Sequence, residues 1–407
     1  MQKRNINLRV VRDDTDQLDK QTKNSLQKDT MVISGFHKLK SRKRIVIGGV
    51  AIIVALAAIF LVIFLQTYTK VRVTDTYKIG NAADNNYEEF AGGVLKYSRD
   101  GISYLNLKGE EKWNQPYQMK NPFVDVGSES VAVADKGGND IMVFGKDGLK
   151  GEIRTTLPIE KITVSEQGIV GAILKNESSP QIICYDTAGN VLVEHKASLT
   201  GTGYPLDIAL SADGMVMQVV YLSVNNGDMV SRVNYYNFGE AGEEKEDHQV
   251  ACKEYKESVL ASGFFVGNSV SAVVGDNCLT IFKGKDVPKE KISVSLEGEI
   301  QSVFHSDKCI GVITKTEGQS GYELRLFNLS GKEVLTEPFT GTYTSVKMSG
   351  NQVIMYDGKK CSIFTKNGIH RFEGEMDNNI LEIFPVIGVN KYIVMNANGM
   401  ESVRLIK

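Results

Sequence analysis

The chain has 407 residues, with 47 Lys+Arg, 49 Asp+Glu, 42% hydrophobic residues, 39 Gly and 5 Cys. The net charge of -2 excludes a globally basic nucleic-acid-binding protein, and the hydrophobic content excludes a mostly disordered chain. Five cysteines are too few for a dense disulfide scaffold. The length allows two or three average domains or one large domain.

The charge is unevenly distributed along the chain. Residues 1–44 hold 12 Lys+Arg and 5 Asp+Glu, which gives a net charge of +7. Residues 45–65 hold no charge, and residues 66–407 hold 35 Lys+Arg and 44 Asp+Glu, which gives -9. The sequence therefore indicates three segments that lie in three different environments.

Residues 1–44 are predicted to be a disordered basic cytoplasmic tail. Residues 1–30 are rich in Asp, Gln, Lys, Asn and Thr, and they contain too little apolar surface to offset the entropy of ordering. The basic run at residues 38–44 would fix membrane topology and attract anionic lipid headgroups. A docking or phosphorylated segment is the alternative, because Ser and Thr residues lie near basic residues there.

Residues 45–65 form an apolar segment without a charged or hydrogen-bonding side chain. At about 1.5 Å per residue, a helix of this length would span a hydrocarbon core of about 30 Å. A buried helix of a soluble protein would carry a polar stripe, and a cleaved signal peptide would have a shorter apolar region and a small-residue cleavage site. We therefore expect a transmembrane signal-anchor helix.

The residues flanking this segment predict its orientation. Only Lys70 and Arg72 follow it closely, whereas five cations precede it: Lys38, Lys40, Arg42, Lys43 and Arg44. Because Lys and Arg accumulate on the cytoplasmic side, the N-terminus should be cytoplasmic. Residues 66–407 would then form an extracytoplasmic domain.

Residues 66–407 are predicted to be all-β. Short runs rich in Val, Ile, Phe and Tyr are broken by Gly, Asn and Asp at intervals of about ten residues, as in successive strands and turns. Of the 39 glycines, 36 lie in this part of the chain, as many tight turns would require.

A repeat with a mean period near 43 residues runs through this domain. In each copy a strand ends in a large apolar or aromatic residue, and Gly follows four positions later, except that Asp286 replaces Gly in one copy. The copies are Leu105–Gly109, Phe144–Gly148, Tyr185–Gly189, Tyr235–Gly239, Phe282–Asp286, Phe327–Gly331 and Phe364–Gly368. This is the period of a four-stranded β-propeller blade.

One further period after Phe364 reaches the end of the chain, so residues 401–406 would be the third strand of an incomplete eighth blade. Residues 71–79 form an otherwise unassigned strand that could complete it and close the ring. Seven blades would leave one repeat unplaced. We therefore predict a β-propeller of about eight four-stranded blades, in which an N-terminal strand closes the last blade.

Two copies carry a longer motif. In residues 104–113, YLNLKGEEKW, a strand runs into a Gly turn and then Trp113, and residues 327–335, FNLSGKEVL, have Leu335 in the Trp position. The motif resembles the repeat of quinoprotein-like (PQQ- and WD40-like) propellers. The layout as a whole resembles uncharacterised bacterial single-pass membrane-anchored β-propeller proteins of that superfamily. The resemblance implies an architecture and no activity.

Quinone-dependent dehydrogenases, the enzymes to which this resemblance points, use adjacent cysteines, a stacking Trp and a calcium ion. The cysteines here lie 26 to 68 residues apart, so they should pack as small apolar residues, although two of them could form a disulfide: Cys184, Cys252, Cys278, Cys309 and Cys361. The four histidines of the domain also lack metal-ligand spacing. We predict no catalytic residue, cofactor or metal site.

Loops supply the candidate binding residues, because functional groups of rigid scaffolds usually lie in loops. The connections between the second and third strands of the third, fourth and sixth copies should share one face of the ring. They provide Glu177, Asn225, Asn226, Asp228, Glu317 and Gln319. Residues 240–247 hold five acids and one Lys on the opposite face, as a solvated turn or a contact for a basic partner.

The sequence favours a non-enzymatic binding or scaffold protein of the bacterial cell membrane. Its extracytoplasmic propeller would contact an envelope protein or polymer, and not nucleic acid. One alternative is a divergent propeller enzyme, either a quinone-dependent oxidoreductase or a hydrolase with residues gathered at the central channel. An extracytoplasmic ligand sensor is the other.

Overall fold

The computed structural model describes residues 49–62, 65–80, 82–225, 227–315 and 321–407. The chain divides into two compact units, Met1–Gln66 and Thr67–Lys407. The predicted tail, residues 1–44, lies outside the described residues. The fold described below is that of the second unit.

The described part of the predicted membrane segment is helical over residues 49–62. Residues 45–48 and 63–64 of that segment lie outside the described residues. Among the helices that the structure describes, none has both the length and the apolar character needed to cross a membrane. A membrane span therefore stays a prediction from the sequence.

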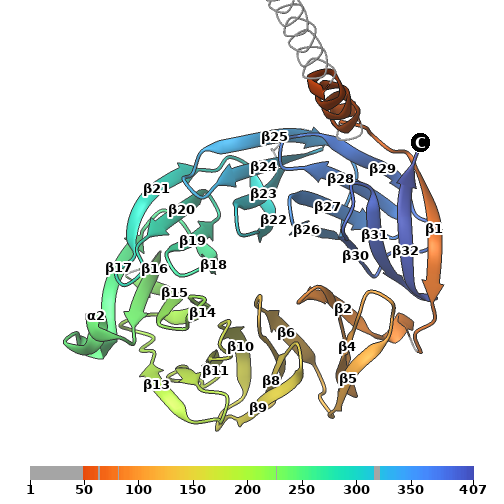
Figure 1. Cartoon of the computed structure of the whole chain (residues 1–407). Helices are drawn as coiled ribbons and strands as arrows, with labels where there is room; N and C mark the ends of the chain where they lie inside the picture. Colours follow the sequence, from red (N-terminus) through yellow and green to blue (C-terminus); the bar gives the residue numbers. More distant parts are fainter. Residues whose placement is uncertain (1–48, 63–64, 81, 226, 316–320) are drawn as a thin grey trace, which may run out of the picture. The chain divides into compact units, whose positions relative to one another are not determined.

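Within Thr67–Lys407, the described strands form eight four-stranded antiparallel sheets, which stand as blades around a central channel (Figure 1). The predicted eight-bladed propeller is thereby confirmed. Blades 1 and 2 consist of β2 (Asn86–Phe90), β3 (Gly93–Ser98), β4 (Gly101–Leu105), β5 (Glu111–Pro116), β6 (Pro122–Val126), β7 (Val131–Asp135), β8 (Asp140–Gly145) and β9 (Gly148–Arg154). Blades 3 and 4 consist of β10 (Ile159–Val164), β11 (Val170–Leu174), β12 (Gln181–Tyr185), β13 (Val191–Lys196), β14 (Tyr204–Leu210), β15 (Val216–Asn225), β16 (Asp228–Asn237) and β17 (Gln249–Tyr255).

The second half of the ring repeats this arrangement. Blades 5 and 6 consist of β18 (Leu260–Val266), β19 (Val270–Gly275), β20 (Cys278–Lys283), β21 (Lys289–Ser295), β22 (Glu299–His305), β23 (Cys309–Lys315), β24 (Tyr322–Asn328) and β25 (Glu333–Phe339). Blades 7 and 8 consist of β26 (Ser345–Ser349), β27 (Gln352–Asp357), β28 (Lys360–Thr365), β29 (His370–Glu375), β30 (Glu382–Pro385), β31 (Lys391–Asn396), β32 (Gly399–Ile406) and β1 (Lys70–Tyr77). Three short helical turns are η1 (Ala82–Asp84), α2 (Glu240–Glu243) and η2 (Glu246–His248).

The core lies between neighbouring blades. The middle strands are apolar on both faces, as in β11, where all five residues are buried, because a blade lies on either side. The outer strand β13 alternates between exposed and half-buried residues. One core cluster joins Ile141 of blade 2 to Leu174 of blade 3, and equivalent clusters follow around the ring.

The recurring glycine lies in the turn between the third and fourth strands. Gly331 has φ 78°, and a Cβ atom there would lie 2.5 Å from Cγ2 of Ile292 on the preceding blade. At Gly109, with φ 71°, the Cβ atom would lie 2.8 Å from Tyr77 of blade 8. At these two positions of the repeat, glycine is needed both for the left-handed backbone and for close contact with the previous blade.

The Trp of the longer motif also packs one blade against the next. The Trp113 ring stacks on Phe144 of blade 2, with ring centroids 5.1 Å apart and planes 7° apart, and its indole N–H donates to the carbonyl of Lys146 at 2.9 Å. Leu335 occupies the same place between blades 6 and 7, where a Cβ atom at Gly368 would lie 2.9 Å from its Cδ1. In this chain the motif serves blade packing.

Blade 8 joins the two ends of the domain. β1 runs antiparallel to β32, from the pair Lys70 and Ile406 to the pair Tyr77 and Met400. In Figure 1 the orange β1 lies beside the blue β32 at the rim of the ring. The predicted closure by an N-terminal strand is confirmed.

Candidate functional site

The six predicted binding residues belong to connections between second and third strands. These connections lie on one face of the ring, which we call the 2–3 face, from residues 99–100 in blade 1 to residues 397–398 in blade 8. Glu177 is exposed between β11 and β12, and Asp228 is exposed at the start of β16, where it pairs with Asn225. Asn226, Glu317 and Gln319 lie outside the described residues. Of the described residues in this set, Glu177 lies on blade 3, whereas Asn225 and Asp228 lie on blade 4.

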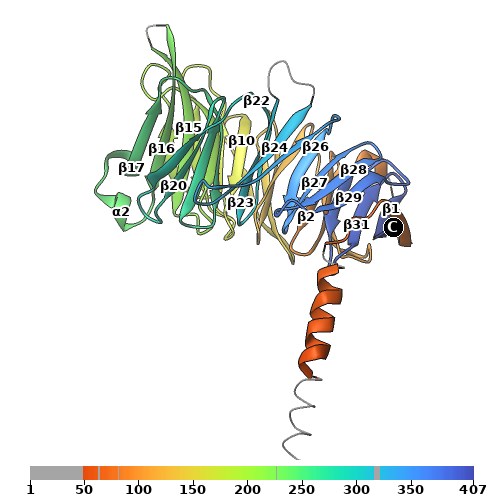
Figure 2. The same ribbon diagram turned by 90° about the horizontal axis from the view of Figure 1, so that it is seen from above.

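The hairpin of blade 4 extends beyond the strands beside it. β15 and β16 have ten residues each, and their pairing continues to Asn225 and Asp228. The neighbouring strands β14 and β17 end their pairing at Leu222 and Ser231. The last pairs of the hairpin therefore project as a two-stranded tip, seen at the upper left of Figure 2.

The hairpin tip is apolar on one face. Val224 and Met229 are cross-strand partners, and they are 67% and 56% exposed. The base of the hairpin is fixed by Arg232, whose guanidinium donates to the carbonyl of Gly201 at 3.0 Å and pairs with Glu254. The hairpin tip therefore exposes the apolar pair Val224 and Met229, and Arg232 fixes the base of the hairpin.

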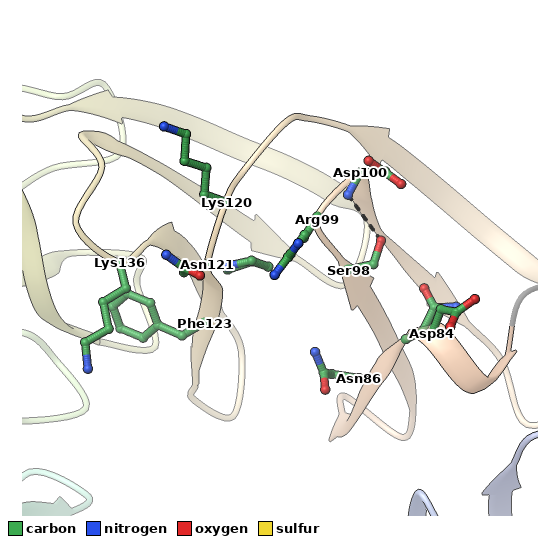
Figure 3. A pocket seen from close by; sticks show the side chains of 11 residues that line it. Asp84, Asn86, Ser98, Arg99, Asp100, Lys120, Asn121, Phe123 and Lys136 are labelled. Carbon is green, nitrogen blue, oxygen red and sulfur yellow. Dashed lines mark hydrogen bonds between the residues drawn. The ribbon is translucent and has the colours of Figure 1, made fainter.

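A pocket of about 630 Å³ lies on the 2–3 face between blades 1 and 2. Three cations line it: Arg99 in the β3–β4 turn, Lys120 before β6, and Lys136 in the β7–β8 turn. Figure 3 shows Arg99 reaching toward Asn121, with the two lysines further out. Within the part of the chain that the structure describes, none of the three cations forms an ion pair.

Backbone hydrogen bonds hold the frame of this pocket. The N–H of Met119 donates to the carbonyl of Arg99 at 2.9 Å, and the N–H of Lys136 donates to the carbonyl of Asn121 at 3.0 Å. The Asn121 N–H donates to Oδ1 of Asp135 at 2.8 Å. The loops from both blades are therefore tied to one another around the cavity.

The central channel contains a second polar site. A cavity of about 690 Å³ is lined by first strands of blades 2 to 6. Nζ of Lys161 lies 2.6 Å from Oδ1 of Asp207, whose Oδ2 also accepts the N–H of Gly263 at 2.9 Å. Asp125 accepts the N–H of Val164 at 2.7 Å. These contacts link the first strands of blades 2 to 5.

A similar arrangement joins blades 7, 8 and 1. Lys347 on β26 forms an ion pair with Glu382 on β30, and Oε1 of Glu382 also accepts the N–H of Ile383 at 2.8 Å. Glu88 on β2 is within electrostatic reach of both residues. We call Glu88, Lys347 and Glu382 the seam cluster, because blade 8 is the blade that closes the ring.

Burial shifts the pKa values of the channel acids. It raises the pKa of Glu88 to about 7, and the negative charge of Glu382 adds to the rise, whereas Lys347 opposes it. The pKa of Glu382 itself is raised by burial, again against Lys347. Burial also raises the pKa of Asp125 to about 6, although the N–H of Val164 favours its ionised form.

The cysteines and histidines have mostly packing roles. Four cysteines are buried, Cys252 is exposed, and none of the five forms a disulfide in the described structure. His305 stacks on Phe264 with ring centroids 4.1 Å apart, and burial lowers its pKa to about 4. No group of three or more metal-ligating side chains occurs among the described residues. The acidic segment 240–247 forms α2 and part of η2, on the face opposite the 2–3 face as predicted.

Residues 64–405 match the model of a family of unknown function, DUF5711. The chain belongs to this family. None of the curated proteins resembles it in sequence. Solved structures with a similar fold include the computationally designed protein Ika8, which is 12% identical, with 82% of this chain and 98% of that chain covered and a TM-score of 0.51.

Two natural proteins have a similar fold with lower TM-scores. BamB from Moraxella catarrhalis is 12% identical, with 83% of this chain and 100% of that chain covered and a TM-score of 0.48. Hydrazine synthase of Kuenenia stuttgartiensis is 11% identical, with 72% of this chain and 98% of that chain covered and a TM-score of 0.46. At these identities the comparison with solved structures shows the propeller fold alone.

The raised pKa of Glu88 predicts that this DUF5711 propeller loses stability as pH rises from about 4.5 to about 7. In that range the folded chain holds a proton on Glu88 that the unfolded chain releases, so raising the pH favours unfolding, by about 3 kcal/mol. Glu88→Gln should remove this part of the pH dependence, measured by denaturant unfolding at several pH values. Glu110→Gln, at an exposed carboxylate, is the control. A slope unchanged in Glu88→Gln would contradict the assignment.

Proposed function

We propose that this chain is a non-enzymatic binding or scaffold protein that contacts a partner protein through the 2–3 face. The observation that carries the proposal is the projecting hairpin of blade 4 with its exposed Val224 and Met229 pair. An apolar pair on a projecting element is suited to entering a groove on another protein, where a few buried side chains provide most of the binding energy.

The support of the hairpin favours such a role. Arg232 ties its base to Gly201 and Glu254, so the base of the hairpin is held in place on blade 4. Beyond Leu222 and Ser231, the two hairpin strands also have no neighbouring strand in the described structure. Their free backbone groups could pair with a strand of the partner.

The proposed location is the extracytoplasmic side of a bacterial cell membrane, with residues 45–65 as a single-pass anchor. The support comes from the sequence: the segment carries no charge, five cations lie within seven positions before it, and the domain that follows has a net charge of -9. The partner would then be an envelope protein.

Site-specific photocrosslinking in cells tests the proposal. A photoreactive residue at Met229 should give one discrete adduct, identifiable by mass spectrometry. Val224→Ser, which removes the apolar cross-strand partner of the probe, should abolish this adduct. A probe at Leu192, which is 49% exposed on the rim strand β13, is the matched control and should give no such adduct. Labelling of Cys252, the exposed cysteine, by a membrane-impermeant maleimide checks the location in the same cells.

Two results would count against the proposal. Adducts that are the same from Met229 and Leu192 would show that the hairpin has no special role. An adduct that persists after Val224→Ser would show that the apolar pair does not direct the contact.

A further inference from the structure

The pocket between blades 1 and 2 is separate from the blade 4 hairpin, and it has the chemistry of a ligand site. Its volume of about 630 Å³ lies within the range of small-molecule sites, about 300–1,000 Å³. The domain has a net charge of -9, yet this one cavity is lined by three cations that form no ion pair with any residue that the structure describes. The side chains that line the pocket therefore carry more positive than negative charge, whereas the domain as a whole is negatively charged.

We infer that this pocket binds an anionic saccharide. Arg99, Lys120 and Lys136 provide the charge that attracts a carboxylate or sulfate group, and the guanidinium can hold such a group through two parallel hydrogen bonds. The charge alone does not define the ligand, because two acids also line the cavity.

Asp84 and Asp100 discriminate between classes of anion. A bare phosphate ion would meet their negative charge, whereas the hydroxyl groups of a sugar can donate hydrogen bonds to these carboxylates. Asn121 can both donate to hydroxyl groups and accept from them. A ligand that combines one acidic group with several hydroxyl groups uses all of these side chains.

Phe123 provides the pocket with an apolar surface that suits a sugar ring. It is half-buried at the start of β6 and, with Pro122, offers an apolar surface beside the polar side chains of the cavity. One face of a sugar ring consists of C–H groups, which can pack on an aromatic ring. The backbone bonds from Met119 and Lys136 hold the loops in place, so the site needs little reorganisation to bind.

Isothermal titration of the full chain in detergent tests the inference, with trigalacturonate, its methyl ester and inorganic phosphate as probes. Trigalacturonate should bind, and its neutral methyl ester should bind at least about tenfold more weakly, as expected for a lost charge-assisted contact. Arg99→Gln should weaken trigalacturonate binding by about tenfold or more. Arg154→Gln, at a side chain that is 85% exposed on β9, removes the same charge elsewhere and should have no effect.

Each contrary result overturns the inference. Equal losses for Arg99→Gln and Arg154→Gln would show general attraction to a cationic surface. Phosphate binding as tight as that of trigalacturonate would indicate a simple anion site. Absence of trigalacturonate binding at about 1 mM, the weak end of specific affinities, would reject the saccharide. Thermal unfolding of Arg99→Gln should match the unsubstituted chain, because Arg99 is exposed and makes no described side-chain bond.

Discussion

Deletion of residues 67–78, which include β1, is expected to destabilise the propeller more than any single substitution. β1 completes blade 8, and without it the whole length of β32 becomes an open edge. The deletion also uncovers an apolar cluster that contains Leu405 and Phe372, against which Val71 and Val73 pack. The ring would lose both its closing pairs and part of its core.

The size of the effect follows from the buried side chains. Tyr68 is buried in the same cluster, and Tyr77 packs against a neighbouring one. Burial of each large apolar side chain contributes about 1.5–3 kcal/mol, so four of them contribute roughly 5 kcal/mol or more. This is a large part of a typical folding free energy of about 5–15 kcal/mol.

Thermal unfolding and limited proteolysis of the detergent-solubilised chain measure the effect. The deletion should lower Tm by about 10 °C or more and expose a cleavage site near β32. Two point variants separate pairing from side-chain burial. Val73→Asp, on the face toward the core, should destabilise strongly, whereas Arg72→Asp, on the exposed face, should have little effect. An unchanged Tm after the deletion would mean that β1 does not close the ring.

The number of blades and their closure could be predicted from the sequence because the repeat has a local cause. In turns such as that of Gly331, glycine adopts the left-handed backbone and also contacts the previous blade. The third copy shows how far this reaches. Its sequence pattern predicts strands at residues 160–164, 168–174, 181–185 and 190–195, and the structure has them within two residues of those positions.

The polar sites could not be predicted in the same way, because they depend on contacts between blades. Glu88 and Glu382 are 294 positions apart in the sequence, and only the closed ring brings them to one cluster. Lys161 and Lys347 each interrupt an apolar first strand, and this pattern could have indicated that each lysine pairs with an acid. Which acid each lysine meets depends on the register between blades, which the sequence pattern does not contain.

The pocket cations were missed for a different reason. Arg99 lies in a two-residue turn between β3 and β4, and such turns were interpreted only as breaks between strands. The predicted loop residues were chosen for the length of their loops. That criterion selected the hairpin at Asp228, but it did not select the short turns that line the pocket between blades 1 and 2.

Lys347→Met is expected to destabilise the propeller by about 3 kcal/mol at pH 8. Glu382 is 6% exposed, and Lys347 is the cation that pairs with it, so the substitution leaves a buried carboxylate without its counter-charge. The loss should shrink as the pH is lowered, because Glu382 can then take up a proton and become neutral. Denaturant unfolding at about pH 5 and about pH 8 measures the loss of unfolding free energy caused by Lys347→Met at each pH.

A second substitution identifies the cause of this loss. If the buried charge is responsible, Glu382→Gln added to Lys347→Met should restore most of the stability at pH 8, since the neutral amide needs no counter-charge. Lys112→Met, which breaks the exposed pair with Glu110, should cost less than about 1 kcal/mol at either pH. Equal effects of Lys347→Met at both pH values, with no rescue by Glu382→Gln, would instead assign the role of Lys347 to the contact of its ammonium group with the Phe384 ring, 5.8 Å from the ring centroid.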